Sequence, residues 1–119
     1  MYYWNRNESR SNFVWELVGL SNDIHKWAKD KGFWDDNNPN LGEKIALMHS
    51  ELSEALEGLR HGNPPSNHIP AYTSMEEELA DCIIRILDVS SYARMNLYSA
   101  VMDKMVFNET RPHKHGKEF

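Results

Sequence analysis

Acidic residues form two short, equally spaced pairs in this sequence. Glu51 and Glu54 are three positions apart, and Glu78 and Asp81 repeat that spacing later in the chain. On a helix, residues three apart share one face, with their Cβ atoms about 5–6 Å apart. Two such pairs held close together would repel, and a hard cation such as Mg²⁺, which binds carboxylates, waters and phosphates, removes the repulsion. The spacing therefore indicates a divalent-metal site, with a solvated acidic helix face as the simpler alternative.

A second group of polar residues lies near the end of the sequence. Lys104, Asn108 and Arg111 follow one another at steps of four and three, so they share one helix face, and Lys117 follows in a basic tail. Lys and Arg side chains are suited to binding phosphate. A solvated helix end would explain the same cations, because positive charge is favourable at the C-terminal end of the helix dipole.

The elements that must position these residues are helices. Apolar residues recur at steps of three and four, the period of an amphipathic helix. The three apolar rows are Phe13, Leu17, Leu20, Ile24 and Trp27; Ile45, Met48, Leu52, Leu56 and Leu59; and Met75, Leu79, Cys82, Ile83, Ile86 and Leu87. A fourth helix is expected from about Asn96 to Thr110, because Pro112 disfavours helical geometry at the residue before it.

Helix ends are marked by capping residues. These signals are Ser11 or Asn12 before the first row, Gly32 after it, Asn40 with Glu43 before the second, and Thr73 with Glu76 before the third. Residues 33–42 and 61–70, rich in Asn, Pro and Gly, are expected to be loops. We therefore expect an all-α fold in which residues 1–119 form a single domain, a four-helix bundle-like subunit.

Composition narrows the possible partners and compartment. The sequence carries 18 acidic residues against 13 Lys and Arg, a formal charge of −5, which argues against binding a nucleic-acid polymer. Cys82 is the single cysteine, so an internal disulfide and a cysteine-based zinc cluster are excluded. No apolar stretch approaches the ~20 residues of a membrane helix, and no targeting segment is visible. We expect a cytoplasmic protein that does not bind membranes.

The sequence segments around these residues resemble one protein family. Residues 43–57 read EKIALMHSELSEALE, residues 77–88 read EELADCIIRILD, and Lys104, Asn108 and Arg111 precede the ending His115-Gly116-Lys117. In this combination and order, the segments are similar to the MazG-like all-α nucleoside triphosphate pyrophosphohydrolases. The resemblance covers roughly residues 13–117.

The resemblance implies a metal-dependent hydrolase. Glu51, Glu54, Glu78 and Asp81 would be the catalytic residues and would bind two or more Mg²⁺ ions, with Mn²⁺ as a substitute. The enzyme would cleave a nucleoside triphosphate, with a deoxynucleotide favoured, to the monophosphate and pyrophosphate in nucleotide-pool house-cleaning. It would act as a homodimer or homotetramer whose sites are lined by more than one chain.

The resemblance also implies residues that bind the substrate. Lys104, Asn108, Arg111 and Lys117 would hold the phosphates. His25 and Trp34 stand where the deoxycytidine-triphosphate-hydrolysing relatives contact the base. The simpler alternatives are a partly buried, hydrogen-bonded His25 and a Trp34 that anchors the loop to the helix. We interpret the other three tryptophans as packing or interface residues: Trp4, Trp15 and Trp27.

Two other functions are alternatives to this one. A ferritin-like di-iron bundle also uses carboxylates from facing helices, but it needs Glu-x-x-His pairs, and no glutamate here has a histidine three residues later. A non-catalytic helical interaction module with a solvated acidic face is the remaining alternative, and the aromatic N-terminus and six methionines would suit a partner surface.

Overall fold

The fold is all-α, as the apolar periodicity predicted. A computed structural model describes residues 6–119 and contains four α-helices and a short 3₁₀ turn. They are α1 (Arg6–Asp30), α2 (Leu41–Arg60), α3 (Ser74–Tyr92), α4 (Leu97–Glu109) and η1 (His113–Gly116). The predicted packing role of Trp4 falls outside the described residues. No helix within residues 6–119 is long and apolar enough to cross a membrane.

Most of the predicted helix ends are confirmed. Thr73 and Glu76 form the reciprocal capping box at the start of α3, and the Asn40 side chain accepts a hydrogen bond from the Glu43 backbone N–H at the start of α2. The predicted start of the first helix is wrong. α1 already begins at Arg6, because no proline or glycine precedes residue 12 to stop the helix, so Ser11 and Asn12 lie inside it.

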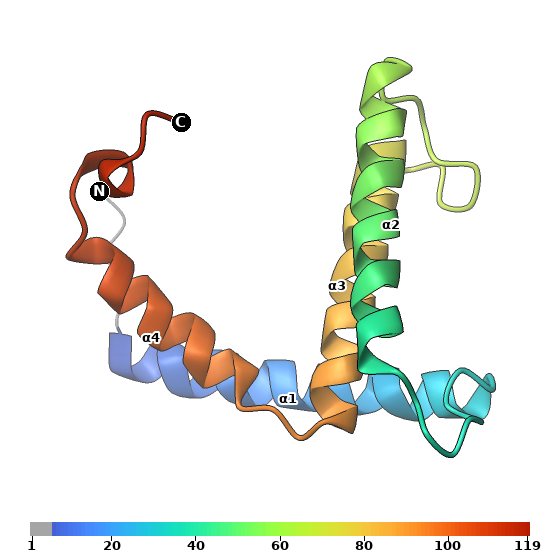
Figure 1. The fold of residues 1–119 in the computed structure, drawn as a ribbon, viewed down its shortest axis with the longest axis horizontal. Helices are drawn as coiled ribbons and strands as arrows, with labels where there is room; N and C mark the ends of the chain where they lie inside the picture. Colours follow the sequence, from blue (N-terminus) through green and yellow to red (C-terminus); the bar gives the residue numbers. More distant parts are fainter. Residues whose placement is uncertain (1–5) are drawn as a thin grey trace.

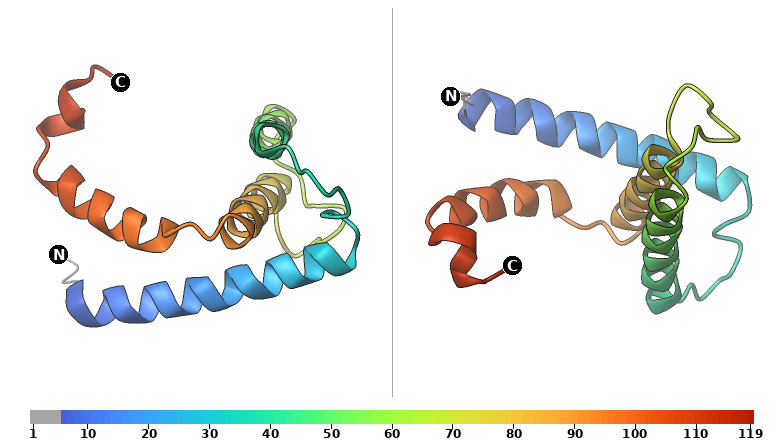
Figure 2. Two further views of the ribbon diagram at one scale, coloured as in Figure 1. Left: turned by 60° about the horizontal axis from the view of Figure 1, so that its bottom comes forward. Right: turned by 90° about the horizontal axis from the view of Figure 1, so that it is seen from above.

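The helices are arranged as two arms on one long helix. α2 and α3 run antiparallel, side by side, and stand across the C-terminal half of α1 (Figure 1). α4 lies along the N-terminal half of α1, and η1 and the C-terminal segment continue beyond it (Figures 1 and 2). The acidic pairs therefore lie on one arm and the basic residues of α4 on the other.

Small residues allow α1 and α3 to cross closely. Ser21 and Ala28 on α1 are almost fully buried, and the Ser21 hydroxyl donates a hydrogen bond to the Leu87 carbonyl oxygen of α3. One turn away, the Ser91 hydroxyl of α3 donates to Oδ1 of Asn22 at 2.9 Å. The buried Ser21–Leu87 contact favours this register of α1 on α3, because a shift by one residue would leave the Ser21 hydroxyl unpaired.

The face of α2 that packs on α3 is not its apolar row. Glu51 and Ala55 are the buried residues of α2, whereas about half of the surface of Ile45, Leu52, Leu56 and Leu59 is exposed. Gly58 makes the close approach possible, because a Cβ atom there would lie 2.6 Å from the Ser74 hydroxyl and 3.2 Å from its Cβ. These four large apolar side chains of α2 are thus left facing outward.

The described residues are mostly helical but do not close into one bundle. Tyr98 and Met102 bury the inner face of α4, which packs against α1, so α4 does not cover the exposed side of the α2–α3 pair. The predicted helix number and class are confirmed. The bundle itself is not formed by the residues described here, because α4 packs on α1 and not on the α2–α3 pair.

Candidate functional site

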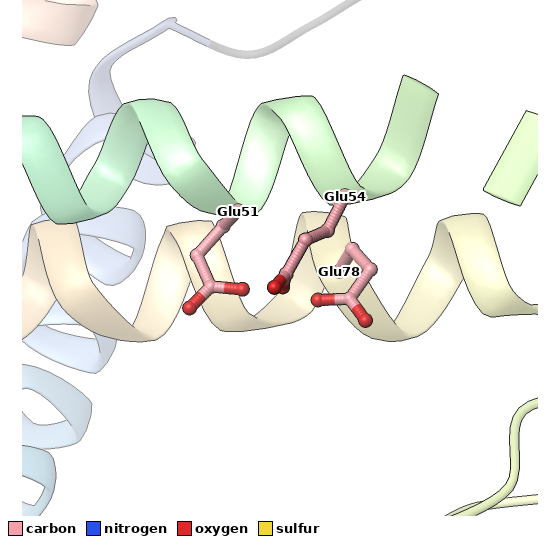
Figure 3. Close-up of side chains that lie close together, drawn as sticks. All are labelled: Glu51, Glu54 and Glu78. Atoms are coloured by element: carbon pink, nitrogen blue, oxygen red, sulfur yellow. The ribbon is translucent and has the colours of Figure 1, made fainter. Parts of the chain in front are cut away.

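Three of the four predicted metal ligands converge in the structure. Glu51 and Glu54 project from α2 toward Glu78 of α3, so that their carboxyl groups lie together on one side of the helix pair (Figure 3). One carboxylate oxygen from each residue lies within 4.8 Å of the others. We call Glu51, Glu54 and Glu78 the carboxylate triad. The antiparallel packing of α2 and α3 creates this triad, because it places the turn of α2 that carries Glu51 and Glu54 beside the turn of α3 that carries Glu78.

The triad is strained electrostatically when no cation is bound. Burial, followed by the hydrogen-bonded carboxyls of Glu51 and Glu54, raises the pKa of Glu78 from 4.5 to about 7. Burial also raises the pKa of Glu51, but hydrogen bonds from Arg85 and Glu78 outweigh it and hold that pKa below its usual range. Glu78 is therefore partly protonated near neutral pH, whereas Glu51 is ionised.

Arg85 is a partner that the sequence did not reveal. Its Nε donates a hydrogen bond of 2.8 Å to Oε1 of Glu51, across from α3 to α2. The sequence places Arg85 on the same side of α3 as Glu78 and Asp81. A solvent-exposed charged face explains this spacing as well as a binding site does. The decisive feature is the burial of Glu51, since a buried carboxylate needs a paired cation, and this burial appears only once α2 packs on α3.

Asp81 lies apart from the triad. It is half-buried on α3, one turn after Glu78, but it does not belong to the group of oxygens that converge within 4.8 Å. Burial raises its pKa, and the charge of Glu51 adds to the increase. Asp81 therefore contributes negative charge beside the triad, and it faces the neighbouring cavity.

A cavity of about 460 Å³ adjoins the triad. It lies where α1, α2 and α3 meet, and its size falls in the ~300–1,000 Å³ range of small-molecule sites. Its charged residues are Lys44, Glu51, Asp81, Arg85 and Asp88, and its walls are apolar: Ile24, Trp27, Ala28, Phe33, Leu47, Ile84 and Val89. Glu51, Asp81 and Arg85 thus connect the carboxylates with an aromatic-lined space.

The two residues predicted to contact a base meet at Asp88. The Nδ1 atom of His25 lies 2.8 Å from Oδ1 of Asp88, and the Trp34 Nε1–H lies 3.0 Å from both carboxylate oxygens. Tyr92 stacks on the Trp34 ring with centroids 4.2 Å apart, and the Lys44 ammonium lies 4.2 Å from the same ring centre. His25 and Trp34 do not line the cavity, whereas Asp88, Trp27 and Phe33 do.

The predicted phosphate-binding residues lie on the other arm. Lys104 and Arg111 are positioned over the Phe107 ring, 4.5 and 5.7 Å from its centre. The half-buried Asn108 keeps its Oδ1 atom without a hydrogen-bond partner, and Lys117 is exposed in the C-terminal segment. Figure 1 shows α4 and this segment well separated from α2 and α3. The structure of the single chain therefore does not bring these residues to the triad.

The donor set of the triad fits a divalent cation that prefers oxygen. With metal–oxygen distances of about 2.0–2.1 Å, oxygens on opposite sides of Mg²⁺ lie about 4.2 Å apart, so the observed spread of up to 4.8 Å needs only small side-chain movements. The longer bonds of Ca²⁺ fit as well. The triad can hold such an ion, and its geometry does not select Mg²⁺ over similar cations.

Comparisons with known proteins add nothing to this geometry: no family model, curated protein or solved structure matches the chain.

Proposed function

We propose that this protein is a Mg²⁺-dependent nucleoside triphosphate pyrophosphohydrolase of the MazG-like type, acting on nucleotide pools in the cytoplasm. One observation carries the proposal: three carboxylates converge beside a cavity that has aromatic walls. A nucleotide needs both features, because its triphosphate binds through metal ions and its base binds between apolar surfaces.

The residues of the chain have distinct roles in this proposal. Glu51, Glu54 and Glu78 hold the cations, with Asp81 completing the charge around them. Bound Mg²⁺ supplies charge neutralisation at the phosphates and lowers the pKa of a coordinated water. The exposed Glu54 accepts a proton from the attacking water, whose oxygen bonds to the α-phosphorus as the bond to the leaving pyrophosphate breaks. Arg85, between the triad and the cavity, neutralises phosphate charge from the same chain.

The full site of the proposal contains residues of a second subunit. Lys104, Asn108, Arg111 and Lys117 are too distant to meet phosphates bound at the triad of their own chain. The outward row Ile45, Leu52, Leu56 and Leu59 offers a surface for another copy, since large contiguous apolar patches mark interfaces. We propose a homodimer or homotetramer in which the basic arm of one chain reaches the acidic arm of another.

The test is pyrophosphate release from a panel of the standard dNTPs and modified nucleotides, with Mg²⁺ and with EDTA. Turnover that requires the metal is expected. Glu51→Gln should reduce it at least about 100-fold, because metal catalysis contributes several kcal/mol. The matched control is Glu57→Gln, an exposed site on the same helix that pairs only with Arg60 and His61 in the contacts seen here. It should retain near-native turnover.

A negative panel would overturn the enzymatic proposal. The same exposed apolar row favours the second candidate, a non-catalytic helical interaction module. That candidate predicts no turnover on any nucleotide and no effect of Glu51→Gln on partner binding. Near-native turnover by a folded Glu51→Gln protein would refute the assignment of this residue to the metal.

A further inference from the structure

Asp88 is held firmly at the wall of the cavity. It accepts hydrogen bonds from Trp34 Nε1–H and is paired with His25 Nδ1, and Asp88 and His25 side chains are only 14% and 13% exposed. Both partners come from outside α3: His25 is on α1, and Trp34 is in the loop that follows it. Two independent segments therefore fix the orientation of this carboxylate.

The Trp34 ring has little surface left for a ligand. Tyr92 is stacked on it at 4.2 Å with an interplanar angle of 19°, and the Lys44 ammonium is also 4.2 Å from its centre. Lys44 is held in place by its hydrogen bond of 3.0 Å to the Phe33 carbonyl oxygen. In this arrangement Trp34 serves Asp88 as a hydrogen-bond donor, and stacking on a ligand falls to Trp27 and Phe33, which line the cavity.

Asp88 lines the cavity and keeps unused acceptor capacity. A carboxylate has about four acceptor positions on two oxygens. His25 and Trp34 share Oδ1, whereas Oδ2 receives only the second branch of the Trp34 hydrogen bond. An ionised carboxylate accepts hydrogen bonds and cannot donate them. A ligand in this cavity is therefore favoured when it presents an N–H group to Asp88, and disfavoured when it presents a carbonyl oxygen.

We propose that Asp88 is the specificity-determining residue of the site and selects nucleotides whose base carries an exocyclic amino group, with His25 and Trp34 as its positioning residues. The inference rests on the proposed function and narrows its substrate class. Cytosine, adenine and guanine carry such an amino group. Uracil and thymine carry a carbonyl oxygen where cytosine carries its amino group. Their only donor on that edge is the ring N3–H, which lies between two carbonyl oxygens that would face the carboxylate with like partial charge.

Metal-free binding of nucleoside monophosphates tests the inference apart from catalysis. Calorimetric titration in EDTA should show tighter binding of dCMP, dAMP or dGMP than of dUMP and dTMP, by about tenfold or more for one hydrogen bond to a charged group. Asp88→Asn, whose amide both donates and accepts, should remove that preference. Asp23→Asn, an exposed aspartate on α1, is the control with the same change of charge and should keep it.

A second variant tests the inference independently, in case Asp88→Asn does not fold. Trp34→Phe keeps a ring that can stack on Tyr92 but removes the N–H donor to Asp88, so it should weaken the preference for the aminated monophosphates. Equal binding of dCMP, dAMP, dGMP and dUMP by the native protein would overturn the inference. So would an undiminished preference in Trp34→Phe or in folded Asp88→Asn.

The two proposals fail in different ways. If no dNTP releases pyrophosphate but aminated monophosphates still bind through Asp88, the enzymatic function is wrong and the specificity assignment stands. If pyrophosphate is released from dUTP and dTTP as fast as from the aminated dNTPs, the enzymatic function stands and the role of Asp88 is wrong.

Discussion

The carboxylates of Glu51 and Glu78 respond to the same neighbourhood in opposite directions. Both are removed from water, which by itself raises a carboxyl pKa. Glu51 has the Arg85 guanidinium beside it and stays ionised, whereas Glu78 faces Glu51 and Glu54 and has its pKa raised to about 7. The guanidinium of Arg85 thus decides which of the two acids is protonated more readily, because it stabilises the negative charge of Glu51.

The raised pKa of Glu78 makes the stability of the metal-free protein depend on pH. The folded protein binds this proton more tightly than the unfolded chain, whose glutamate has the usual value of 4.5. The stabilisation by protonated Glu78 is therefore complete below pH 4.5 and is lost as the pH rises through about 7. We expect the free energy of unfolding, measured by urea titration in EDTA, to fall over this interval.

Glu78→Gln isolates this contribution. The amide cannot ionise, so the free energy of unfolding of the variant should fall less steeply than that of the native protein between pH 4.5 and about pH 7. Parallel curves for the two proteins would contradict the raised pKa. Saturating Mg²⁺ should reverse the trend in the native protein, because a cation binds the deprotonated triad and stabilises the folded state more as the pH rises.

At the scale of elements, the approach of α2 to α3 decides whether the triad forms. Gly58 lies one turn after Glu54, on the side of α2 that meets the start of α3. The Thr73–Glu76 capping box fixes where α3 begins, and so places Ser74 against Gly58. Local capping and one missing side chain thereby set the distance between the two acidic helices.

Gly58→Ala should destabilise the protein although alanine is the better helix former. The added Cβ would meet the Ser74 hydroxyl at 2.6 Å and its Cβ at 3.2 Å, and such overpacking costs about 1–3 kcal/mol. This exceeds the gain of up to about 1 kcal/mol from helix propensity. We expect a net loss of about 1 kcal/mol in urea unfolding, with weaker metal binding at the triad.

Gly19→Ala is the matched control on α1. A Cβ at Gly19 would meet nothing within 4 Å, so only the propensity gain remains and the variant should be more stable by about 0.5–1 kcal/mol. If Gly58→Ala stabilises the protein as much as Gly19→Ala, then α2 and α3 do not pack so closely at Gly58 that a methyl group is excluded.

At the scale of the whole molecule, the two arms leave much apolar surface uncovered. Leu52, Leu56 and Leu59 on α2 are 47–53% exposed, and Ile83 on α3 is 56% exposed. Large exposed apolar patches are uncommon on monomers and mark interfaces. The outward row of α2 is what a second subunit would cover in the proposed oligomer.

Charges placed in that row should separate the subunits. Leu52→Glu/Leu56→Glu is expected to convert an oligomer to a monomer in sedimentation analysis and to abolish turnover, because the basic arm of the second chain would be lost. Ala46→Glu/Ser53→Glu adds the same charge to exposed positions of α2 outside the row and should leave both the mass and the turnover unchanged. A native protein that sediments as a monomer would refute the oligomer.

Local interactions made much of the fold predictable from sequence. The apolar period gave the helices, and short-range caps such as Thr73 with Glu76 gave their ends. The exposed apolar row of α2 could not be anticipated, because periodicity shows which residues share a face and not what that face meets. The start of α1 was missed because a potential cap at Ser11 does not end a helix that no breaker interrupts.

The sequence by itself determined the all-α class and which acidic residues share a helix face, because both depend on spacing along one chain. Only the tertiary structure decided that Glu51, Glu54 and Glu78 meet while Asp81 stands beside them. It alone paired Arg85 with Glu51, and placed Asp88 between His25 and Trp34. Those contacts join residues of different helices and loops. The distances between these residues depend on how closely α3 packs against the small residues of α1 and α2.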